Sequence, residues 1–199
     1  MAAPPLRLPA ARRRRQLLDV ALARFAANGF SGTSMDDVAE AAGVTKPVLY
    51  QHFGSKRQLF LELLDDVGAQ LVAAIGDATA GADGPRQQVE AGFGAYVRLV
   101  AEHPDAFSLL FGSGARRDPE FADAVRRVED SLADAVAGLI DADLDAPHRQ
   151  ALGTAIVGMA EGVVRRRLSD GDGALADPDR LARQLAELAW GGLRSVRRL

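Results

Sequence analysis

A group of polar and cationic side chains near the N-terminus could bind anions and hydrogen-bond acceptors. The group comprises Ser34, Thr45, Lys46, Tyr50, Gln51, His52 and Lys56, with the apolar Pro47 and Val48 among them. The ammonium group of Lys46 can donate to guanine acceptors, whereas Pro47 and Val48 can make only apolar contacts, for example with a thymine methyl group. Contacts to phosphate set position and affinity without reading the base sequence. These residue types therefore favour double-stranded DNA as a binding partner.

Two short predicted helices position these side chains. The apolar face of the first is formed by Met35, Val38, Ala39 and Ala42, at the i, i+3, i+4, i+7 spacing of a helix. Thr33 or Ser34 is expected to cap its N-terminus. Asp36 and Asp37 lie near the positive end of its dipole. Because an acid that faces DNA would be repelled, we assign Asp36 to capping and not to contact.

A glycine joins the first predicted helix to the second. Gly43 can adopt the left-handed backbone that a tight reversal needs. Thr45 is expected to cap the second helix, whose first turn tolerates Pro47 because the first N–H groups of a helix have no internal partner. A helix-turn-helix of this kind places its second helix in the DNA major groove. The same spacing also fits an ordinary helical hairpin buried in an all-α core, so the pattern alone leaves both interpretations open.

Charge is distributed unevenly along the chain. The protein has 199 residues and a formal net charge of −3. Up to Arg57 there are nine basic and four acidic residues, a balance of +5, whereas the remaining 142 residues carry 15 basic and 23 acidic ones, a balance of −8. This asymmetry indicates an end that faces nucleic acid and a body with another role. The run Arg12 to Arg15 fits either additional phosphate or minor-groove contacts or a solvated arm.

Composition argues against several other classes of protein. The chain contains no cysteine, which excludes disulfides, Cys-type zinc sites and thiol nucleophiles and predicts a cytoplasmic location. No apolar run approaches the roughly 18 residues of a membrane span, so we expect no membrane partner. The segment Met1–Arg15 lacks the apolar region of a secretory signal.

Motifs of catalysis and metal binding are missing. The three histidines are far apart in the sequence and lack metal-ligand spacing. The segment Asp141–Asp145 begins like a calcium loop, but Ala146 replaces the required glycine and Leu152 the bidentate acid. Neither a phosphate-binding Gly-Lys loop nor a Gly-x-Ser-x-Gly turn occurs. We therefore expect no enzyme activity, no cofactor and no metal site.

Helical periodicity continues along the whole chain, and no segment alternates as a strand does. The sequence therefore predicts an all-α fold of about nine helices. Met1–Ala11 is expected to be a disordered arm, and a helix that follows it to Asn28 is expected to end in a left-handed cap at Gly29. A fourth helix is predicted at about residues 55–76, before a break from Gly76 to Pro85.

The N-terminal motif resembles that of the TetR family of bacterial transcriptional regulators. The matching residues are Gly29-Phe30, Thr33-Ser34, Val38-Ala39, Ala42-Gly43-Val44-Thr45, Leu49-Tyr50, His52-Phe53 and Ser55-Lys56. The resemblance covers about a third of the chain, from Arg12 to Leu64. It implies a helix-turn-helix DNA-binding domain at residues 12–57, joined by the fourth helix to a ligand-binding and dimerisation domain at residues 77–199. It also implies a homodimer whose body binds a small ligand and controls the spacing of two DNA-reading heads.

Individual roles follow from this resemblance and from local chemistry. In similar proteins the positions of Tyr50 and His52 bind phosphates, although a core position is the alternative for Tyr50. Lys56 is expected at the start of the fourth helix, where its charge and the helix N-terminus both favour a phosphate. The operator is expected to be an inverted repeat, with half-sites at least about one helical turn apart. We expect a repressor, and the alternative is a helical module that binds a small molecule without reading DNA.

Small residues in the last two predicted helices indicate a dimer interface. Glycine costs a helix roughly 0.5–1 kcal/mol relative to alanine, so Gly153, Gly158 and Gly162 in one helix require a compensating gain. Close approach of two helices supplies it, either between subunits or within one. We predict a homodimer through the eighth and ninth helices, with Gly158, Gly162 and the anchor Trp190 in the interface.

Aromatic residues of the body are candidates for a ligand cavity. They are Phe93, Tyr96, Phe107 and Phe111, together with Met159, on helices that enclose the cavity in similar proteins. Each of them alone also fits an ordinary core position. Together they predict an apolar pocket for a small hydrophobic or amphipathic effector.

Overall fold

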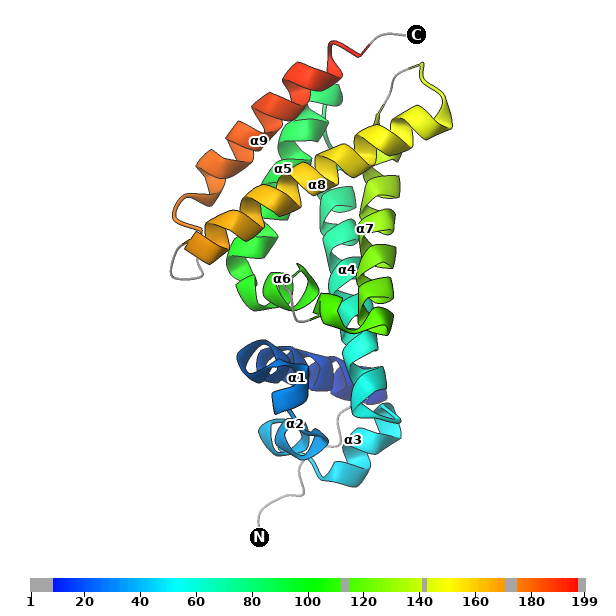
Figure 1. Cartoon of the computed structure of the whole chain (residues 1–199), viewed down its shortest axis with the longest axis vertical. Coiled ribbons are helices and arrows are strands. Elements are labelled where there is room, and N and C mark those ends of the chain that lie inside the picture. Colours follow the sequence, from blue (N-terminus) through cyan, green and yellow to red (C-terminus); the bar gives the residue numbers. More distant parts are fainter. Residues whose placement is uncertain (1–8, 112–114, 141–142, 171–174, 197–199) are drawn as a thin grey trace. The chain divides into compact units, whose positions relative to one another are not determined.

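The computed structural model describes residues 9–111, 115–140, 143–170 and 175–196, without the side chains of residues 116 and 170. This part of the chain forms nine α-helices and one 3₁₀ turn and contains no strand, which confirms the predicted all-α class (Figure 1). The chain divides into two compact units, residues 1–63 and 64–199, called here the head and the body. Most of the predicted arm and the predicted connectors at residues 112–114 and 171–173 lie outside the described residues, as do residues 141–142.

Three helices and the start of a fourth form the head. They are α1 (Ala10–Gly32), α2 (Met35–Ala41), α3 (Lys46–His52) and α4 (Lys56–Ala80), which continues into the body. The backbone of Gly29 has φ 70°, so the regular part of α1 ends there, as predicted. Phe30 then returns to the core of the head, where its ring centroid lies 6.1 Å from that of Phe25 and 5.1 Å from that of Phe60.

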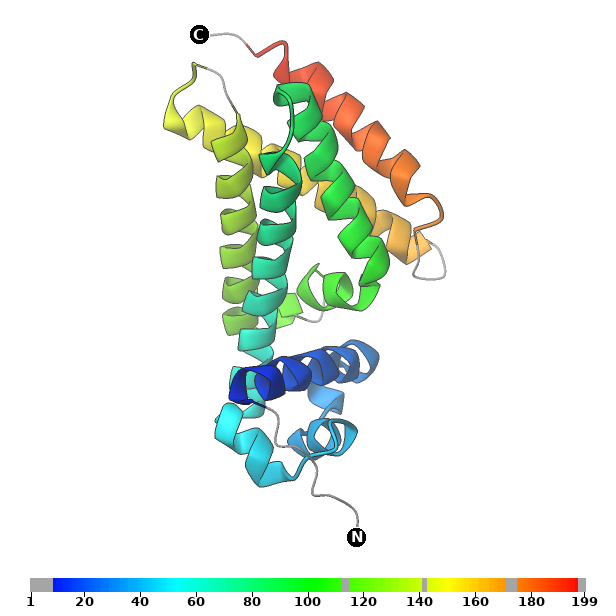
Figure 2. The same cartoon turned by 180° about the vertical axis from the view of Figure 1, so that it is seen from behind.

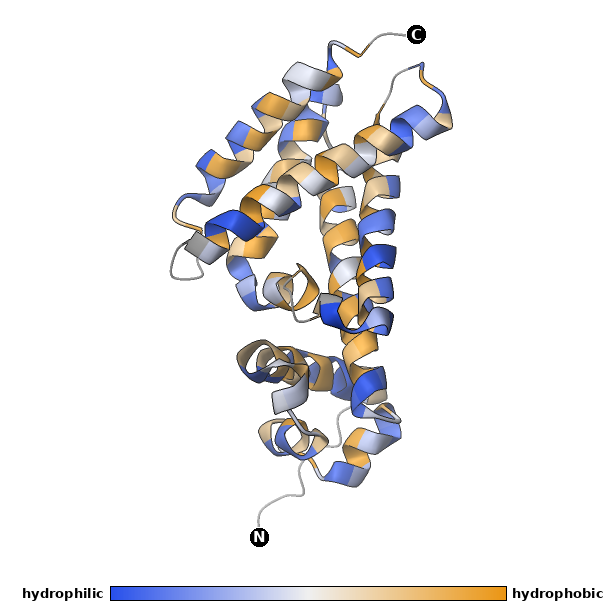
Figure 3. Ribbon diagram, in the orientation of Figure 1, coloured by the Kyte–Doolittle hydropathy of each residue, from blue (hydrophilic) through white to orange (hydrophobic). Residues whose placement is uncertain are grey.

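The body consists of five further α-helices and the later part of α4. They are α5 (Pro85–Glu102), α6 (Pro104–Phe111), α7 (Pro119–Leu139), α8 (Ala146–Asp170) and α9 (Pro178–Leu193), with a 3₁₀ turn at Ala115–Arg117. Helix α7 packs on α8 and α5 packs on α9, while α6 contacts both α5 and α8 (Figures 1 and 2). Hydrophilic and hydrophobic residues alternate around α7 and α9, as expected of helices that bury one face (Figure 3). No helix in the described part of the chain is long and apolar enough to cross a membrane.

The predicted break after the fourth helix is shorter than expected. Helix α4 continues past Gly76 to Ala80, and Gly84 precedes α5 with φ 111°, a conformation that favours glycine. Within α4, the buried hydroxyl of Thr79 donates to the carbonyl of Ile75 at 2.8 Å. The chain reversal is therefore set by Gly84 and Pro85, and Gly76 is an ordinary helical residue.

Helices α7 and α8 approach each other closely at one glycine. A Cβ atom added at Gly153 would collide with the backbone carbonyl oxygen of Ala133, so the backbone would have to move. The glycine therefore permits backbone contact between two helices of the same chain. Of the two interpretations of the glycines in this helix, packing between subunits or within one, the second is correct for Gly153.

We expect Gly153→Ala to lower the free energy of unfolding by about 1–3 kcal/mol, because the added methyl group forces α8 away from α7. Urea denaturation followed by circular dichroism measures this change. Gly94→Ala in α5 is the matched control, since a Cβ atom there meets nothing within 4 Å, and it should leave stability unchanged or raise it by up to about 1 kcal/mol. Equal effects of the two substitutions would contradict the close approach.

Candidate nucleic-acid interface and ligand cavity

A capping box begins α2 and identifies Ser34 as the cap. The Ser34 Oγ accepts a hydrogen bond from the Asp37 backbone N–H at 3.1 Å, and Asp37 Oδ2 accepts one from the Ser34 backbone N–H at 2.7 Å. Hydrogen bonds from the Ser34 backbone and side chain lower the pKa of Asp37. The box therefore stabilises the head above the ordinary carboxyl pKa, and this contribution is lost as the pH falls through the lowered value. Thr33 is buried, and its hydroxyl instead donates to the carbonyls of Arg24 and Gly29.

The assignment of Asp36 to capping is wrong. The capping box uses Ser34 and Asp37, and Asp36 instead pairs with Lys46, whose Nζ donates to Asp36 Oδ2 at 2.9 Å. This bond raises the pKa of Lys46, so the ammonium group stays charged. Both side chains are at least half exposed, and such pairs contribute little to stability. A phosphate or a base that binds Lys46 must therefore compete with a carboxylate that is already in place.

The turn between α2 and α3 has the predicted geometry. Gly43 has φ 63°, and the backbone N–H of Val44 donates to the carbonyl of Ala39 at 3.0 Å. Thr45 is the N-cap residue of α3, as predicted, and is extended, but its hydroxyl makes no capping hydrogen bond. The fixed φ of Pro47 in the first turn is already suited to a helix.

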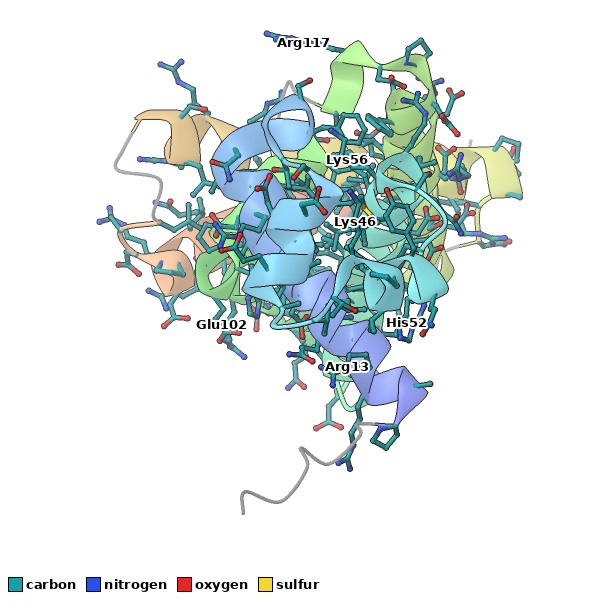
Figure 4. All side chains as sticks on the ribbon, turned by 90° about the horizontal axis from the view of Figure 1, so that it is seen from below. Arg13, Lys46, His52, Lys56, Glu102 and Arg117 are labelled. Atoms are coloured by element: carbon teal, nitrogen blue, oxygen red, sulfur yellow. The ribbon has the colours of Figure 1, made fainter. Side chains whose placement is uncertain are left out.

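Helix α3 buries one face and exposes the other. Leu49 and, just after the helix, Phe53 are fully buried. The exposed candidates are Thr45, Lys46, Pro47, Tyr50 and Gln51, while Val48 and His52 are half-buried. Tyr50 is 43 % exposed and so is not the core aromatic that the alternative interpretation required. The fold therefore gathers most of the predicted DNA-binding residues on one short helix, which runs from Lys46 to His52 (Figure 4).

Lys56 has a structural role that the sequence does not predict. Its Nζ donates to the carbonyls of Phe30 at 2.8 Å and of Thr33 at 2.9 Å, and lies 4.3 Å from the centroid of the Phe30 ring. The ammonium group is thus held by the chain that joins α1 to α2. A phosphate contact by Lys56 stays a prediction, because two of its three donors are already used.

The arginine run belongs to a helix and not to an extended arm, because α1 begins at Ala10. The guanidinium group of Arg14 pairs with Glu62 and lies 5.0 Å from the centroid of the Phe53 ring. Arg13 donates to Gln16 at 2.6 Å, and Arg15 pairs with the carboxylate one turn further on. These contacts leave the predicted DNA contacts of the run untested.

The body contains a partly open cavity of about 320 Å³ whose walls are mainly apolar. Phe93 and Tyr96 of α5 line it, as does Trp190 of α9, the residue that the sequence assigned to the dimer interface. Phe107, Phe111 and Met159 do not line it. The two phenylalanines are buried, with ring centroids 4.9 Å apart, and they fill the core of the body.

The outward faces of α8 and α9 carry the predicted interface residues. Gly158 is exposed and Gly162 half-buried, and a Cβ atom added at either would meet nothing within 4 Å. Leu188 of α9 is 65 % exposed. Neither glycine therefore serves close packing within the described part of the chain, and their place in a dimer interface stays a prediction.

We expect Lys56→Met to lower the free energy of unfolding by about 1–3 kcal/mol, because it removes charged hydrogen bonds to two carbonyls. Thermal and urea unfolding without DNA measure the change. Lys46→Met should leave stability nearly unaltered, since the exposed Lys46–Asp36 pair contributes little. If the two variants were equally stable, Lys56 would not be the internal support that its contacts indicate.

Comparison with protein families gives two matches. The model for bacterial regulatory proteins of the tetR family matches residues 17–63, and the model for a tetracyclin repressor-like C-terminal domain matches residues 85–192. The chain is 32 % identical over 192 residues to the HTH-type transcriptional activator FasR of Mycolicibacterium smegmatis, which covers 96 % of this chain and 87 % of that protein. It is also 32 % identical over 105 residues to the HTH-type transcriptional repressor KstR2 of Mycobacterium tuberculosis, about half of each protein.

Solved structures share the fold over nearly the whole chain. A TetR-like transcriptional regulator from Rhodococcus sp. RHA1 has a TM-score of 0.74 at 30 % identity and covers 96 % of this chain and 100 % of that one. The regulator FadR from Bacillus subtilis, solved in complex with stearoyl-CoA, has a TM-score of 0.77 at 16 % identity and covers 89 % and 98 %. With its helix-turn-helix head and its helical body, the chain belongs to the TetR family and is a DNA-binding transcriptional regulator.

Proposed function

We propose that this regulator is a homodimeric repressor that binds an inverted-repeat operator and is released by a small hydrophobic or amphipathic ligand. The observation that carries the proposal is the exposed face of α3, where Lys46, Tyr50 and Gln51 stand on a helix anchored by buried Leu49. A short helix with one buried and one polar face is suited to the major groove.

In the proposed complex, each head inserts one α3 helix into the major groove. Lys46 leaves Asp36 and donates to a guanine or a phosphate, while Gln51 and the apolar Pro47 contact base edges. Tyr50 and His52 bind phosphates and fix the position of the helix. Two heads bound to successive major grooves require half-sites about one helical turn apart.

Dimerisation through α8 and α9 is supported by the composition of their outward faces. Ala151, Ala155 and Gly158 form an exposed row of small residues on α8, which permits close approach of a second helix. On α9, Leu188 is the most exposed large apolar side chain of the described residues, at 65 %. A second copy of the chain would remove this apolar surface from water.

The cavity is the proposed effector site, and its size and apolar walls are those of a small-molecule pocket. A ligand that binds one arrangement of the dimer more tightly shifts the population towards it. Release follows when that arrangement spaces the heads wrongly for the operator. Stearoyl-CoA in FadR from Bacillus subtilis makes acyl thioesters one class of probe. Because FasR is named an activator, reporter expression with and without the protein distinguishes activation from repression.

The head is tested by gel retardation of the intergenic DNA that flanks its own gene, at low salt. We expect the wild type to retard this DNA and Lys46→Ala with Tyr50→Ala to weaken binding by about 30-fold or more, because two contacts are lost. Circular dichroism should show an unaltered fold. Arg98→Ala, which removes an exposed cation of α5, is the control and should bind normally. Unchanged binding by the double variant would favour the module that does not read DNA.

The dimer interface is tested by Leu188→Arg, which places a charge in the proposed apolar contact. We expect sedimentation equilibrium to show a dimer for the wild type and a monomer for the variant, with operator affinity reduced at least about tenfold. Ser131→Arg introduces the same charge on an exposed position of α7 and should stay dimeric. A dimeric Leu188→Arg variant would place the interface elsewhere.

A further inference from the structure

One tyrosine hydroxyl in the wall of the cavity lacks a hydrogen-bond partner. Tyr96 lines the cavity from α5 and is only 6 % exposed. Its Oη is buried and makes no hydrogen bond to any described residue. Because buried polar groups in native structures are almost always bonded, an orphaned hydroxyl at a cavity wall calls for a partner from outside the protein.

The rest of the lining offers few polar groups. Beside Tyr96, the polar side chains among the described lining residues are Gln88, Trp190 and Arg194. Gln88 and Trp190 are half-buried and Arg194 is exposed, so water reaches all three. The Tyr96 hydroxyl is therefore the one lining polar group that is both buried and unpartnered, and an apolar ligand that covers it without a polar atom would leave it unsatisfied.

A buried carboxylate adjoins the cavity wall that α8 forms. Glu161 follows the lining residue Ala160 in α8 and is 8 % exposed. Burial and then the charge of Glu161 raise the pKa of Tyr96, while Arg165 opposes this more weakly. The hydroxyl consequently stays protonated and can act as a donor. An anionic group bound to this hydroxyl would be repelled by Glu161, because the effect of Arg165 on Tyr96 is weaker than that of Glu161.

A cationic ligand is also disfavoured. The Glu161 carboxylate already accepts a hydrogen bond from Arg165 Nη1 at 2.7 Å in an ion pair. A second cation would have to share this carboxylate with a guanidinium group that is present in every copy of the protein. The Tyr96 hydroxyl therefore lacks a hydrogen-bond acceptor, and a neutral acceptor suits this position best.

We propose that Tyr96 and Glu161 select a ligand with an apolar body and one neutral oxygen, such as the carbonyl of an ester, ketone or thioester or the oxygen of an alcohol. Tyr96 donates to this oxygen, and Glu161 excludes a free carboxylate from the same position. This inference rests on the proposed effector site and specifies the chemical class of the effector.

The single tryptophan of the chain provides a direct test, because Trp190 lines the same cavity. Its fluorescence is titrated in the full-length protein with methyl octanoate, octanoate, nonane and octyltrimethylammonium. We expect methyl octanoate to bind the wild type at least about tenfold more tightly than octanoate or the ammonium compound. Tyr96→Phe should weaken methyl octanoate binding about 3- to 10-fold, the effect of one hydrogen bond, and leave nonane binding unaltered.

Two further measurements complete the test. Tyr96→Phe without ligand should be at least as stable as the wild type, because it removes a buried hydroxyl that has no partner. Glu161→Gln should narrow the difference in binding affinity between methyl octanoate and octanoate. Arg165→Gln is the control, because it also removes the ion pair but keeps the Glu161 carboxylate.

Three results would overturn the inference: an unaltered affinity of Tyr96→Phe for the ester, tighter binding of octanoate or the ammonium compound by the wild type, or no binding of any probe. The last result would also remove the effector site from the proposed function, whereas DNA binding by the head is measured separately. Ester binding that depends on Tyr96 without release of DNA would support the inference and contradict the proposed ligand response.

Discussion

The head depends on one ammonium group at the start of α4. Lys56 binds the carbonyls of Phe30 and Thr33, which belong to the chain between the regular part of α1 and the start of α2. These carbonyls follow the C-terminal end of α1, where positive charge is favoured. The same group lies against the Phe30 ring, so one cation joins the start of α4 to the connection between α1 and α2. Burial of Leu49 and Phe53 then leaves α3 with a single outward face.

The features that the sequence predicted correctly are local ones. The positive φ of Gly29 and Gly43 and the buried face of α3 follow from residues within a few positions of each other. Three interactions were not predicted, because each joins residues ten or more positions apart. They are the hydrogen bond from Lys56 to Phe30, the Asp36–Lys46 pair and the Arg14–Glu62 pair. For such pairs only the packed structure determines which partner is near.

The body shows a second limit of helical periodicity. The pattern identified Phe93, Tyr96, Phe107 and Phe111 as inward-facing, and all four are buried. It could not separate a side chain that lines a cavity from one that fills the core, because both lie on the same face of a helix. The difference depends on where α5, α7, α8 and α9 leave space between them. Trp190 lines that space although its spacing also fitted an interface.

In the proposed function, the head and the body select their binding partners in opposite ways. In the head, Lys46 already has a partner, so a DNA site binds well only when its acceptors replace Asp36 with comparable geometry, and indiscriminate attraction to phosphate is reduced. In the body, Tyr96 has no partner, so a ligand gains most when it supplies the missing acceptor. Every DNA site must break the Lys46–Asp36 bond, but a wrong site fails to replace it with a comparable one, and a wrong ligand leaves a buried donor unsatisfied. Each penalty falls on the incorrect partner, which is what specificity requires.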